Sequence, residues 1–428
     1  MGSGTSRSTS TRVAMGVMAV GLTVLFGAPG SANGPPEVVP ALPPGVSATL
    51  YRASVPPDRA PTAAAIALGE KLFNDKRLSR DDSVACATCH DPKLGFVDGK
   101  TVSVGIGQQK GQRNSPTVLN ALFNAAQFWD GRAGTLEDQA KLPILNPIEM
   151  GMKDGAQVVA KLRAIPEYDK AFRDTFGHEI RYDDLAAAIA AFERTQFSGD
   201  APFDAYIAGE TEAISPAARR GWAVFNGKGR CNSCHAANRV SPLFSDAKFH
   251  NIGIAAQKQD FVSLAREAIG VVRAADPKEI DELAVQSKFS ELGRFLVSKQ
   301  ENDIGSFKTP TLRNIAITGP YMHDGSIVTL WDVIDHYNKG GVPNPYLDGG
   351  MQRLGLSEAE IDDLVTFLFT LTDKKFAALG AKELARQTKQ KTTRPQRDTQ
   401  TAFGQKGHLG DLAPNPDARK SPASIGVY

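Results

Sequence analysis

The four cysteines of this 428-residue chain fall into two copies of one short motif. The motifs are C-A-T-C-H at residues 86–90 and C-N-S-C-H at residues 231–235, so a histidine directly follows each pair. Two thiols on one helical turn can each form a thioether with a porphyrin vinyl group, and the next imidazole can then bind the iron. The motifs therefore predict two covalently attached haem c groups, with His90 and His235 as iron ligands. The thioethers would come from Cys86, Cys89, Cys231 and Cys234.

Paired cysteines have other uses, which fit this pattern less well. Two disulfides, a zinc site with four cysteine ligands, or thioredoxin-like redox motifs would each account for C-x-x-C. None of the three requires a histidine directly after both pairs. Haem attachment explains both cysteines and the histidine of each motif.

Helical periodicity surrounds both motifs, whereas strand signals are sparse. We therefore expect a mainly α fold, with two cytochrome c-like haem domains, long loops and little strand. Ser215 ahead of Pro216, and Ser357 with Glu360 three residues later, are typical helix N-termini. The expected helices span residues 61–74, 135–141, 154–165, 167–176, 182–197, 215–225, 329–338 and 357–371.

The first residues have the pattern of an export signal. Arg7 and Arg12 precede an apolar run over residues 13–26, and small residues follow up to Ala32. This order is typical of a signal peptide, here residues 1–32, and predicts a periplasmic protein. The run is shorter than the roughly 20 residues that span a bilayer, and no other segment is apolar enough, so we expect no membrane span after cleavage.

Composition and motif positions divide the rest of the chain. With 49 Lys and Arg against 47 Asp and Glu, and no run of like charge, no nucleic-acid partner is expected. The expected parts are a Pro-rich linker at 33–59, an N-terminal haem domain at 60–213, a C-terminal haem domain at 214–381 with a charged, weakly amphipathic helical insertion at 255–299 on its surface, and a disordered tail at 382–428.

Four further blocks carry a resemblance to a known family. They are Q-F-W-D-G-R-A at residues 127–133, N-P-I-E-M at 146–150, F-K-T-P-T-L-R-N at 307–314 and G-P-Y-M-H-D-G at 319–325. With both C-x-x-C-H motifs in order around them, residues 60–375 closely resemble the bacterial dihaem cytochrome c peroxidase and MauG family.

The resemblance implies that hydrogen peroxide reacts at the N-terminal haem, while the C-terminal haem stores or relays an electron. Glu149 matches the distal carboxylate, which would move a proton from one peroxide oxygen to the other. Gln139 and Pro143 match neighbours in the same distal pocket, and Trp129 matches the tryptophan between the haems. The family's calcium ion between the domains is also implied. Its matching ligands are Asn114, Thr318 and Pro320.

Two positions depart from the peroxidase branch and agree with MauG. The peroxidases have a distal histidine where this chain has Ile106, which cannot bind iron, so the first haem should be open to peroxide without prior reduction. At the second haem they have a methionine where this chain has Tyr337, and a tyrosine oxygen favours ferric and higher states. The competing sixth ligands are His336, Met322 and Met351.

A third position separates the chain from MauG itself. MauG draws electrons through a surface tryptophan just before the second haem motif, and Gly229 occupies that place here. Trp222 and Trp331 are substitute relay candidates, although core packing is the ordinary use of both. The resemblance is thus to MauG-like enzymes in general, including those that oxidise a tryptophan of a copper-binding partner protein. No role is assigned to His178, His250, His323 or His408.

Three functions are consistent with these residues. The first is a periplasmic peroxidase that uses hydrogen peroxide to form high-valent haem iron and oxidises a partner protein, as MauG does. The second is a cytochrome c peroxidase that removes hydrogen peroxide with electrons from a small cytochrome or cupredoxin. The third is a non-enzymatic dihaem electron-transfer protein.

Overall fold

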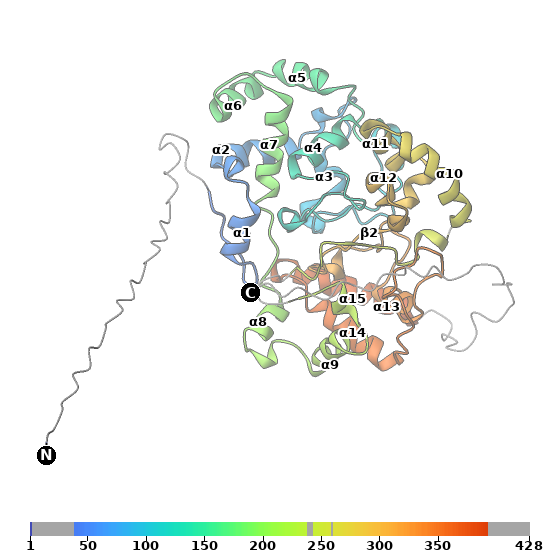
Figure 1. Cartoon of the computed structure of the whole chain (residues 1–428). Coiled ribbons are helices and arrows are strands. Elements are labelled where there is room, and N and C mark those ends of the chain that lie inside the picture. The colour runs from blue at the N-terminus through green and yellow to red at the C-terminus, as the bar shows by residue number, and fades with distance from the viewer. Residues whose placement is uncertain (2–37, 238–242, 258–259, 393–428) are drawn as a thin grey trace. The chain divides into compact units, whose positions relative to one another are not determined.

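The computed structural model describes Met1 and residues 38–237, 243–257 and 260–392. Residues 2–32 of the expected signal peptide, and the expected tail beyond Thr392, lie outside the described residues. The described chain is mainly helical, as expected, and its helices gather around three main cores (Figure 1). No helix in these ranges is long and apolar enough to cross a bilayer.

The first core is built around a close helix pair. α2 (Ala63–Phe73) packs against α7 (Tyr182–Glu193), and a Cβ at Gly69 would lie 1.8 Å from the carbonyl oxygen of Ala188, so the contact requires glycine. The motif helix α3 (Cys86–Cys89) packs on this core through Cys86. The other helices of the group are α4 (Leu136–Leu145), α5 (Gly155–Arg163) and α6 (Pro166–Phe176).

The second core repeats this arrangement. α9 (Pro216–Asn226) packs against α14 (Glu358–Phe369), and a Cβ at Gly221 would lie 2.0 Å from the carbonyl oxygen of Asp363. The second motif forms a short 3-10 turn, Cys231–Ser233, beside this pair. α13 (Leu330–Asn338) and α8 (Pro202–Ile207) complete the group. The core contains a cluster of rings in mutual contact: Phe203, Trp222, Phe225, Phe244 and Phe367.

α8 precedes the expected domain boundary at residue 213 but does not pack with the first core. Phe203 of α8 is buried in the second core, where its ring lies 4.9 Å from that of Trp222. α8 therefore packs with the second core, although the expected boundary at residue 213 places its residues in the N-terminal domain. Sequence periodicity did not reveal α8 because the helix has only six residues.

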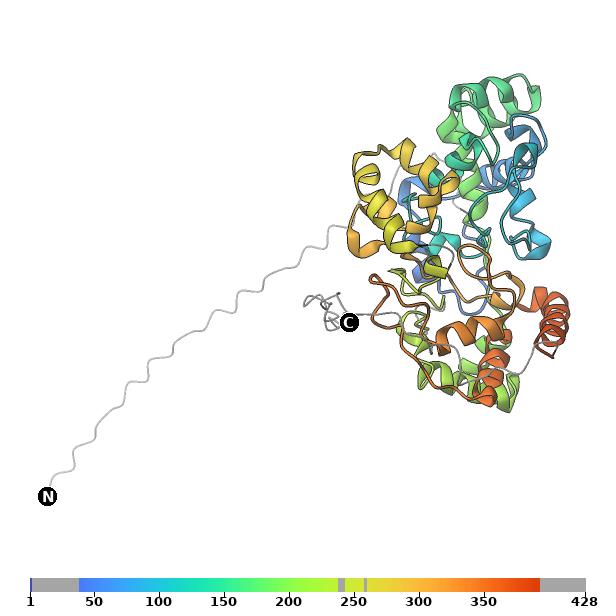
Figure 2. The same ribbon diagram turned by 90° about the vertical axis from the view of Figure 1, so that its right-hand side faces the viewer.

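The insertion forms the third core. α10 (Phe261–Ala274), α11 (Pro277–Gln286) and α12 (Phe295–Ser298) bury their apolar faces against one another, with Asp276 and Glu279 forming a capping box at the start of α11. Both views show these gold helices beside the blue-to-green helices of the first core (Figure 2). The insertion is helical, as expected, and its helices keep an exposed face, but they are amphipathic enough to form a core of their own.

Ordered structure extends further at both ends than expected. α1 (Ala48–Ser54) lies within the expected linker and buries Tyr51 completely. α15 (Ala377–Thr392) continues into the expected tail, because the buried amide of Gln387 accepts a hydrogen bond from the Leu330 backbone and donates one to the Tyr321 hydroxyl. These long-range contacts give the two polar segments a partner that composition alone does not reveal.

Strand structure is slight in the described part of the chain. β1 (Phe249–His250) pairs antiparallel with β2 (Phe307–Lys308), and Phe249 lies opposite Lys308. The backbone nitrogen of Lys308 also donates to the carbonyl oxygen of Trp129, 2.8 Å away. This small ladder thus ties the loop of the first unit that carries Trp129 to the second unit.

Candidate haem sites

The first motif presents a histidine in the form that binds a metal. His90 follows α3 directly, and its Nδ1 lies 3.2 Å from the carbonyl oxygen of Phe96 and 3.1 Å from the hydroxyl of Ser115. Because a carbonyl can only accept, Nδ1 carries the proton and Nε2 keeps its lone pair. Burial lowers the pKa of His90, which keeps the ring neutral.

The second motif repeats this geometry. Nδ1 of His235 lies 2.8 Å from the carbonyl oxygen of Phe244, and burial lowers the pKa of His235 as well. All four cysteines are free thiols, without the disulfides considered above, and burial raises the pKa of Cys86 and of Cys231 to about 12. The two pairs lie in separate cores, which excludes one zinc site with four cysteine ligands. Thiols ready for thioether formation and an Nε2 lone pair at each motif fit haem c.

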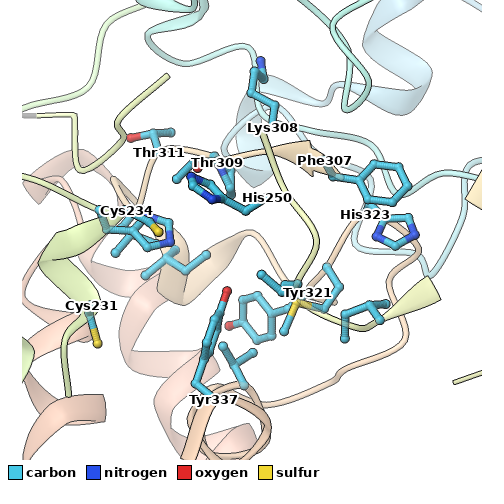
Figure 3. A pocket seen from close by; sticks show the side chains of 18 of the residues that line it. Cys231, Cys234, His250, Phe307, Lys308, Thr309, Thr311, Tyr321, His323 and Tyr337 are labelled. Atoms are coloured by element: carbon cyan, nitrogen blue, oxygen red, sulfur yellow. The ribbon is translucent and has the colours of Figure 1, made fainter. Parts of the chain in front are cut away.

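A large, mainly apolar cavity opens beside the second motif. Figure 3 shows Cys231 and Cys234 on one side and Tyr337 of α13 rising from below, with its hydroxyl pointing into the cavity. Burial raises the pKa of Tyr337, and the nearby Cys234 and Cys231 raise it further, so the phenol is neutral before an iron is bound. An apolar cavity with a few convergent polar groups suits a porphyrin. His235 lies in the same lining.

The competing sixth ligands differ in where they point. His336 is next to Tyr337 on α13 but faces another way, and its Nε2 lies 2.8 Å from the carbonyl oxygen of Ile252. This hydrogen bond occupies the nitrogen that iron would need, so His336 does not fit as a ligand. Met322 and Met351 both line the cavity and stay alternatives to Tyr337.

Trp129 lies between the two motifs. Its indole N–H donates to the carbonyl oxygen of Asn114, 2.8 Å away, and its ring lines the cavity of the second motif. The residue after Asn114 is Ser115, whose hydroxyl lies 3.1 Å from Nδ1 of His90. A short chain of contacts therefore runs from His90 through residues 114–115 to Trp129 and the second cavity. By contrast, Trp222 and Trp331 lie in the second core, with the Trp331 N–H bonded to Asp362.

Glu149 lies on a tight turn that follows α4. Its backbone nitrogen donates to the carbonyl oxygen of Asn146, and its own carbonyl accepts from the nitrogen of Ile106 at 2.9 Å. Burial raises the pKa of Glu149 to about 7, although the cationic Arg132 opposes the shift. The carboxylate is close enough to raise the pKa of the Cys86 and Cys89 thiols, so it faces the first motif.

The residues expected beside Glu149 lie around the same turn. Gln139 is half-buried on α4, one helical turn before Pro143, whose carbonyl oxygen accepts from the Met150 nitrogen at 3.2 Å. Ile106 is buried against the turn, where its Cδ1 would lie 2.1 Å from a Cβ at Gly151. An apolar side chain thus packs against the turn that carries Glu149.

The three residues expected to bind calcium line one side of the second cavity. Asn114 is brought to the segment of Thr318 and Pro320 by its backbone nitrogen, which donates to the carbonyl oxygen of His323. The side-chain amide of Asn114 donates to the Lys100 carbonyl oxygen at 2.9 Å, so its oxygen is turned to the other side. One amide oxygen and two backbone carbonyls are ligands that a hard cation prefers.

Sequence analysis missed two histidines at the sites. His250 lines the cavity between Asp348, 2.7 Å from Nδ1, and Asp246, 2.9 Å from Nε2. Burial opposes protonation, but the two carboxylates raise the pKa of His250 to about 12, so the ring is a cation. Nε2 of His323 lies 3.0 Å from Glu291 of the insertion. The sequence carries one signal for these contacts, which is Asp246 four residues before His250. The other partners, Asp348 of His250 and Glu291 of His323, are remote in the sequence.

The fold and these two sites define a dihaem c-type cytochrome. A family model described as di-haem cytochrome c peroxidase matches residues 63–212. Methylamine utilization protein MauG of Methylorubrum extorquens is 42% identical over 72% of this chain and 78% of its own. Cytochrome-c peroxidase IdrP1 of Denitromonas iodatirespirans is 37% identical over 85% and 93%. A crystal structure of a MauG-like protein associated with microbial copper homeostasis superposes with a TM-score of 0.61 at 31% identity, covering 80% of this chain and 96% of that one.

The chain belongs to the dihaem cytochrome c peroxidase and MauG family. It is therefore a peroxide-dependent oxidoreductase that carries haem c, reacts with hydrogen peroxide and exchanges electrons with a redox partner protein. A purely electron-transferring cytochrome, the third function considered above, is excluded by this membership. Relatives named for both branches match at similar identity, so similarity alone does not separate MauG-like oxidation from peroxide removal.

Proposed function

We propose that this enzyme is MauG-like: it uses hydrogen peroxide at the first haem to oxidise a side chain of a partner protein, and the second haem holds the oxidising equivalent. The observation that carries the proposal is the position of Tyr337, whose hydroxyl projects into the cavity beside His235 and the Cys231–Cys234 pair. When bound, the haems supply the iron that peroxide oxidises. A tyrosine oxygen on the second iron favours its higher oxidation states.

Within this proposal Glu149 handles the proton. As a carboxylate it takes a proton from the near oxygen of peroxide, and as the acid it returns that proton to the departing oxygen. A pKa of about 7 suits both steps, because each form is well populated near neutral pH. Gln139 and Pro143 border the same space, and buried Ile106 leaves the iron position free for peroxide.

Trp129 provides the coupling between the two units. Its indole lines the second cavity and donates a hydrogen bond to the Asn114 carbonyl oxygen. Asn114 lies two residues before Pro116 and directly before Ser115, whose hydroxyl contacts His90. A calcium ion held by Asn114, Thr318 and Pro320 would fix this junction. Each haem belongs to its own core, and the export pattern at residues 1–32 supports a periplasmic enzyme with a periplasmic partner.

Peroxide removal is the second candidate function. It is favoured by relatives that are named cytochrome-c peroxidases, one of them matching over 85% of this chain. Under this alternative a small cytochrome or cupredoxin supplies two electrons in succession, and no residue of the partner is chemically modified. Met322 or Met351 would then be the sixth ligand at the second iron.

One experiment separates the two functions. The oxidised enzyme is mixed with hydrogen peroxide and candidate periplasmic partners, and the partners are analysed by peptide mass spectrometry. We expect mass changes at partner tryptophans that need both enzyme and peroxide. Rapid oxidation of a reduced cytochrome or cupredoxin, with every partner mass unchanged, would favour peroxide removal instead.

A further inference from the structure

The turn that carries Glu149 is held by two bodies of the protein. On one side Ile106 donates its backbone N–H to the Glu149 carbonyl oxygen. On the other side the turn meets the insertion, where Ile148 packs against the core of α10–α12. The insertion belongs in sequence to the second haem unit, so a segment of one unit contacts the distal side of the other.

Asn146 forms the inner frame of this turn. It is almost fully buried, and its carbonyl oxygen accepts from the nitrogens of Glu149 at 3.1 Å and Gly151 at 2.8 Å. Its side-chain oxygen accepts from the nitrogen of Ile148 at 3.1 Å. The orientation of Asn146 therefore fixes the backbone that carries the Glu149 carboxyl.

Asp281 of α11 bonds to this frame and to the neighbouring cation together. One carboxylate oxygen accepts from Nδ2 of Asn146 at 3.4 Å, and the other accepts from Nε of Arg132 at 2.8 Å. Arg132 is buried, stacks 3.6 Å from the Phe128 ring centroid, and forms a second ion pair with Asp130 at 3.1 Å. Its partners are thus two carboxylates, one of them delivered from the insertion.

We propose that Asp281 is a positioning residue for Glu149: beside the apolar contact of Ile148, its carboxylate ties the insertion to both the turn and Arg132, and so sets how readily the distal carboxyl gains and loses its proton. The inference rests on the proposed role of Glu149 in the peroxide reaction. It extends that role by making the insertion of the second unit a determinant of the chemistry of the first.

The charges around Glu149 support this assignment. Burial raises its pKa most, the positive charge of Arg132 lowers it, and the negative charge of Asp281 raises it again. The other titratable groups coupled to Glu149 are the Cys86 and Cys89 thiols of α3, which cannot ionise once they are thioethers. Among the side chains of the protein, Arg132 and Asp281 are then the charged groups that act on the protonation of Glu149.

The test is Asp281→Asn in the haem-bearing full chain, with Glu282→Gln as the matched control on the exposed face of α11. The ionisation of Glu149 is followed directly by the infrared band of its protonated carboxyl, assigned by its loss in Glu149→Gln. We expect Asp281→Asn to lower the midpoint by roughly one pH unit, because a negative charge near Glu149 is lost and Arg132 keeps only Asp130 as its carboxylate partner. The midpoint should stay at the parental pH in Glu282→Gln. Asp281→Glu, which keeps the negative charge, should also have the parental midpoint.

The pH profile of the reaction with peroxide is the second measurement. Its acid limb should move to lower pH in Asp281→Asn by the same amount as the infrared midpoint. An Asp281→Asn enzyme that melts at a lower temperature but keeps the parental midpoint would overturn the proposal, since Asp281 would then be structural only. If Glu149→Gln reacts with peroxide at the parental rate while the infrared midpoint still moves, the proposed function fails and the inference about Asp281 stands.

Discussion

The two haem-binding units are alike up to the histidine and differ on the opposite side. In both, a glycine lets two helices cross closely, a motif with two free thiols lies beside them, and a backbone carbonyl holds Nδ1 of the histidine. The buried Ile106 and the ionisable Glu149 belong to the first unit, whereas Tyr337 lines the cavity of the second unit together with His235. The two motifs are thus built alike, and under the proposed function the difference in chemistry comes from Glu149 and Tyr337.

The largest effect should come from removing the carboxyl of the first unit. Glu149→Gln keeps the shape of the side chain but cannot accept a proton, so we expect the rate constant for the reaction with peroxide to fall about 10²- to 10⁴-fold. Stopped-flow absorbance of the oxidised enzyme measures this rate. The spectrum of the second haem is the internal control and should not change. If the variant reacts as fast as the parent, Glu149 is not an acid–base residue, and this difference between the two units does not exist.

The pH dependence of the same rate constant shows which protonation state of Glu149 acts first. Burial raises the pKa of Glu149 to about 7, and the first step needs the carboxylate. The rate constant should therefore rise with pH, reach half of its maximum near pH 7 and level off roughly one unit higher, while Glu149→Gln should show no such rise. A rate that falls as pH rises through this range would mean that the protonated acid acts first.

The second unit can be tested at Tyr337. Tyr337→Phe removes the only oxygen of this side chain, so we expect the visible spectrum of the second haem to change and its reduction potential to rise by on the order of 0.1 V. Spectroelectrochemistry measures both. Tyr346→Phe, a half-buried tyrosine packed against the insertion core, is the matched control. If the spectrum stays the same in Tyr337→Phe, Met322 or Met351 becomes the ligand to test.

Much of this comparison was accessible from the sequence, because local signals determine it. The motif spacing predicts both histidines, and apolar periodicity predicts the helices that hold them, including α2 and α14. The features that separate the units are less local. Asp281 pairs with Arg132 across 149 residues and His250 with Asp348 across 98, and no spacing rule connects such positions. The direction of His336 was more accessible, since a residue next to Tyr337 on a helix must lie on another face, and its hydrogen bond to Ile252 agrees with this.

Calcium should stabilise the junction between the units. If Asn114, Thr318 and Pro320 bind the ion, calcium at ten times its dissociation constant should add about 1.4 kcal/mol to the free energy of unfolding. The measurement is the melting temperature after dialysis against a chelator, with and without added calcium. Asn114→Ala should abolish the increase, and magnesium, which prefers a smaller and more regular shell, should produce little of it. An equal response of the parent and Asn114→Ala would place the ion elsewhere.

The smallest effect concerns a second buried acid of the first unit, Glu193, whose pKa is raised. Glu193 ends α7 and raises the pKa of Cys86, whereas α14 of the second unit ends in Phe367, Leu368 and Phe369. Burial raises the pKa of Glu193 to about 8, although Arg194 opposes it. Between the unfolded value near 4.5 and this folded value the native chain binds the extra proton, so stability falls as pH rises through that range.

Glu193→Gln tests this asymmetry because it makes the neutral form permanent. We expect the variant to gain about 1–2 kcal/mol relative to the parent at pH 8 and to differ little at pH 4.5, since the parental carboxyl is already protonated there. Denaturant unfolding at the two pH values measures the difference. Glu137 pairs with Arg194 and Arg59 and is present in both proteins, so it cancels from the comparison. A gain that is equal at both pH values would mean that packing, rather than the proton, distinguishes this end of α7.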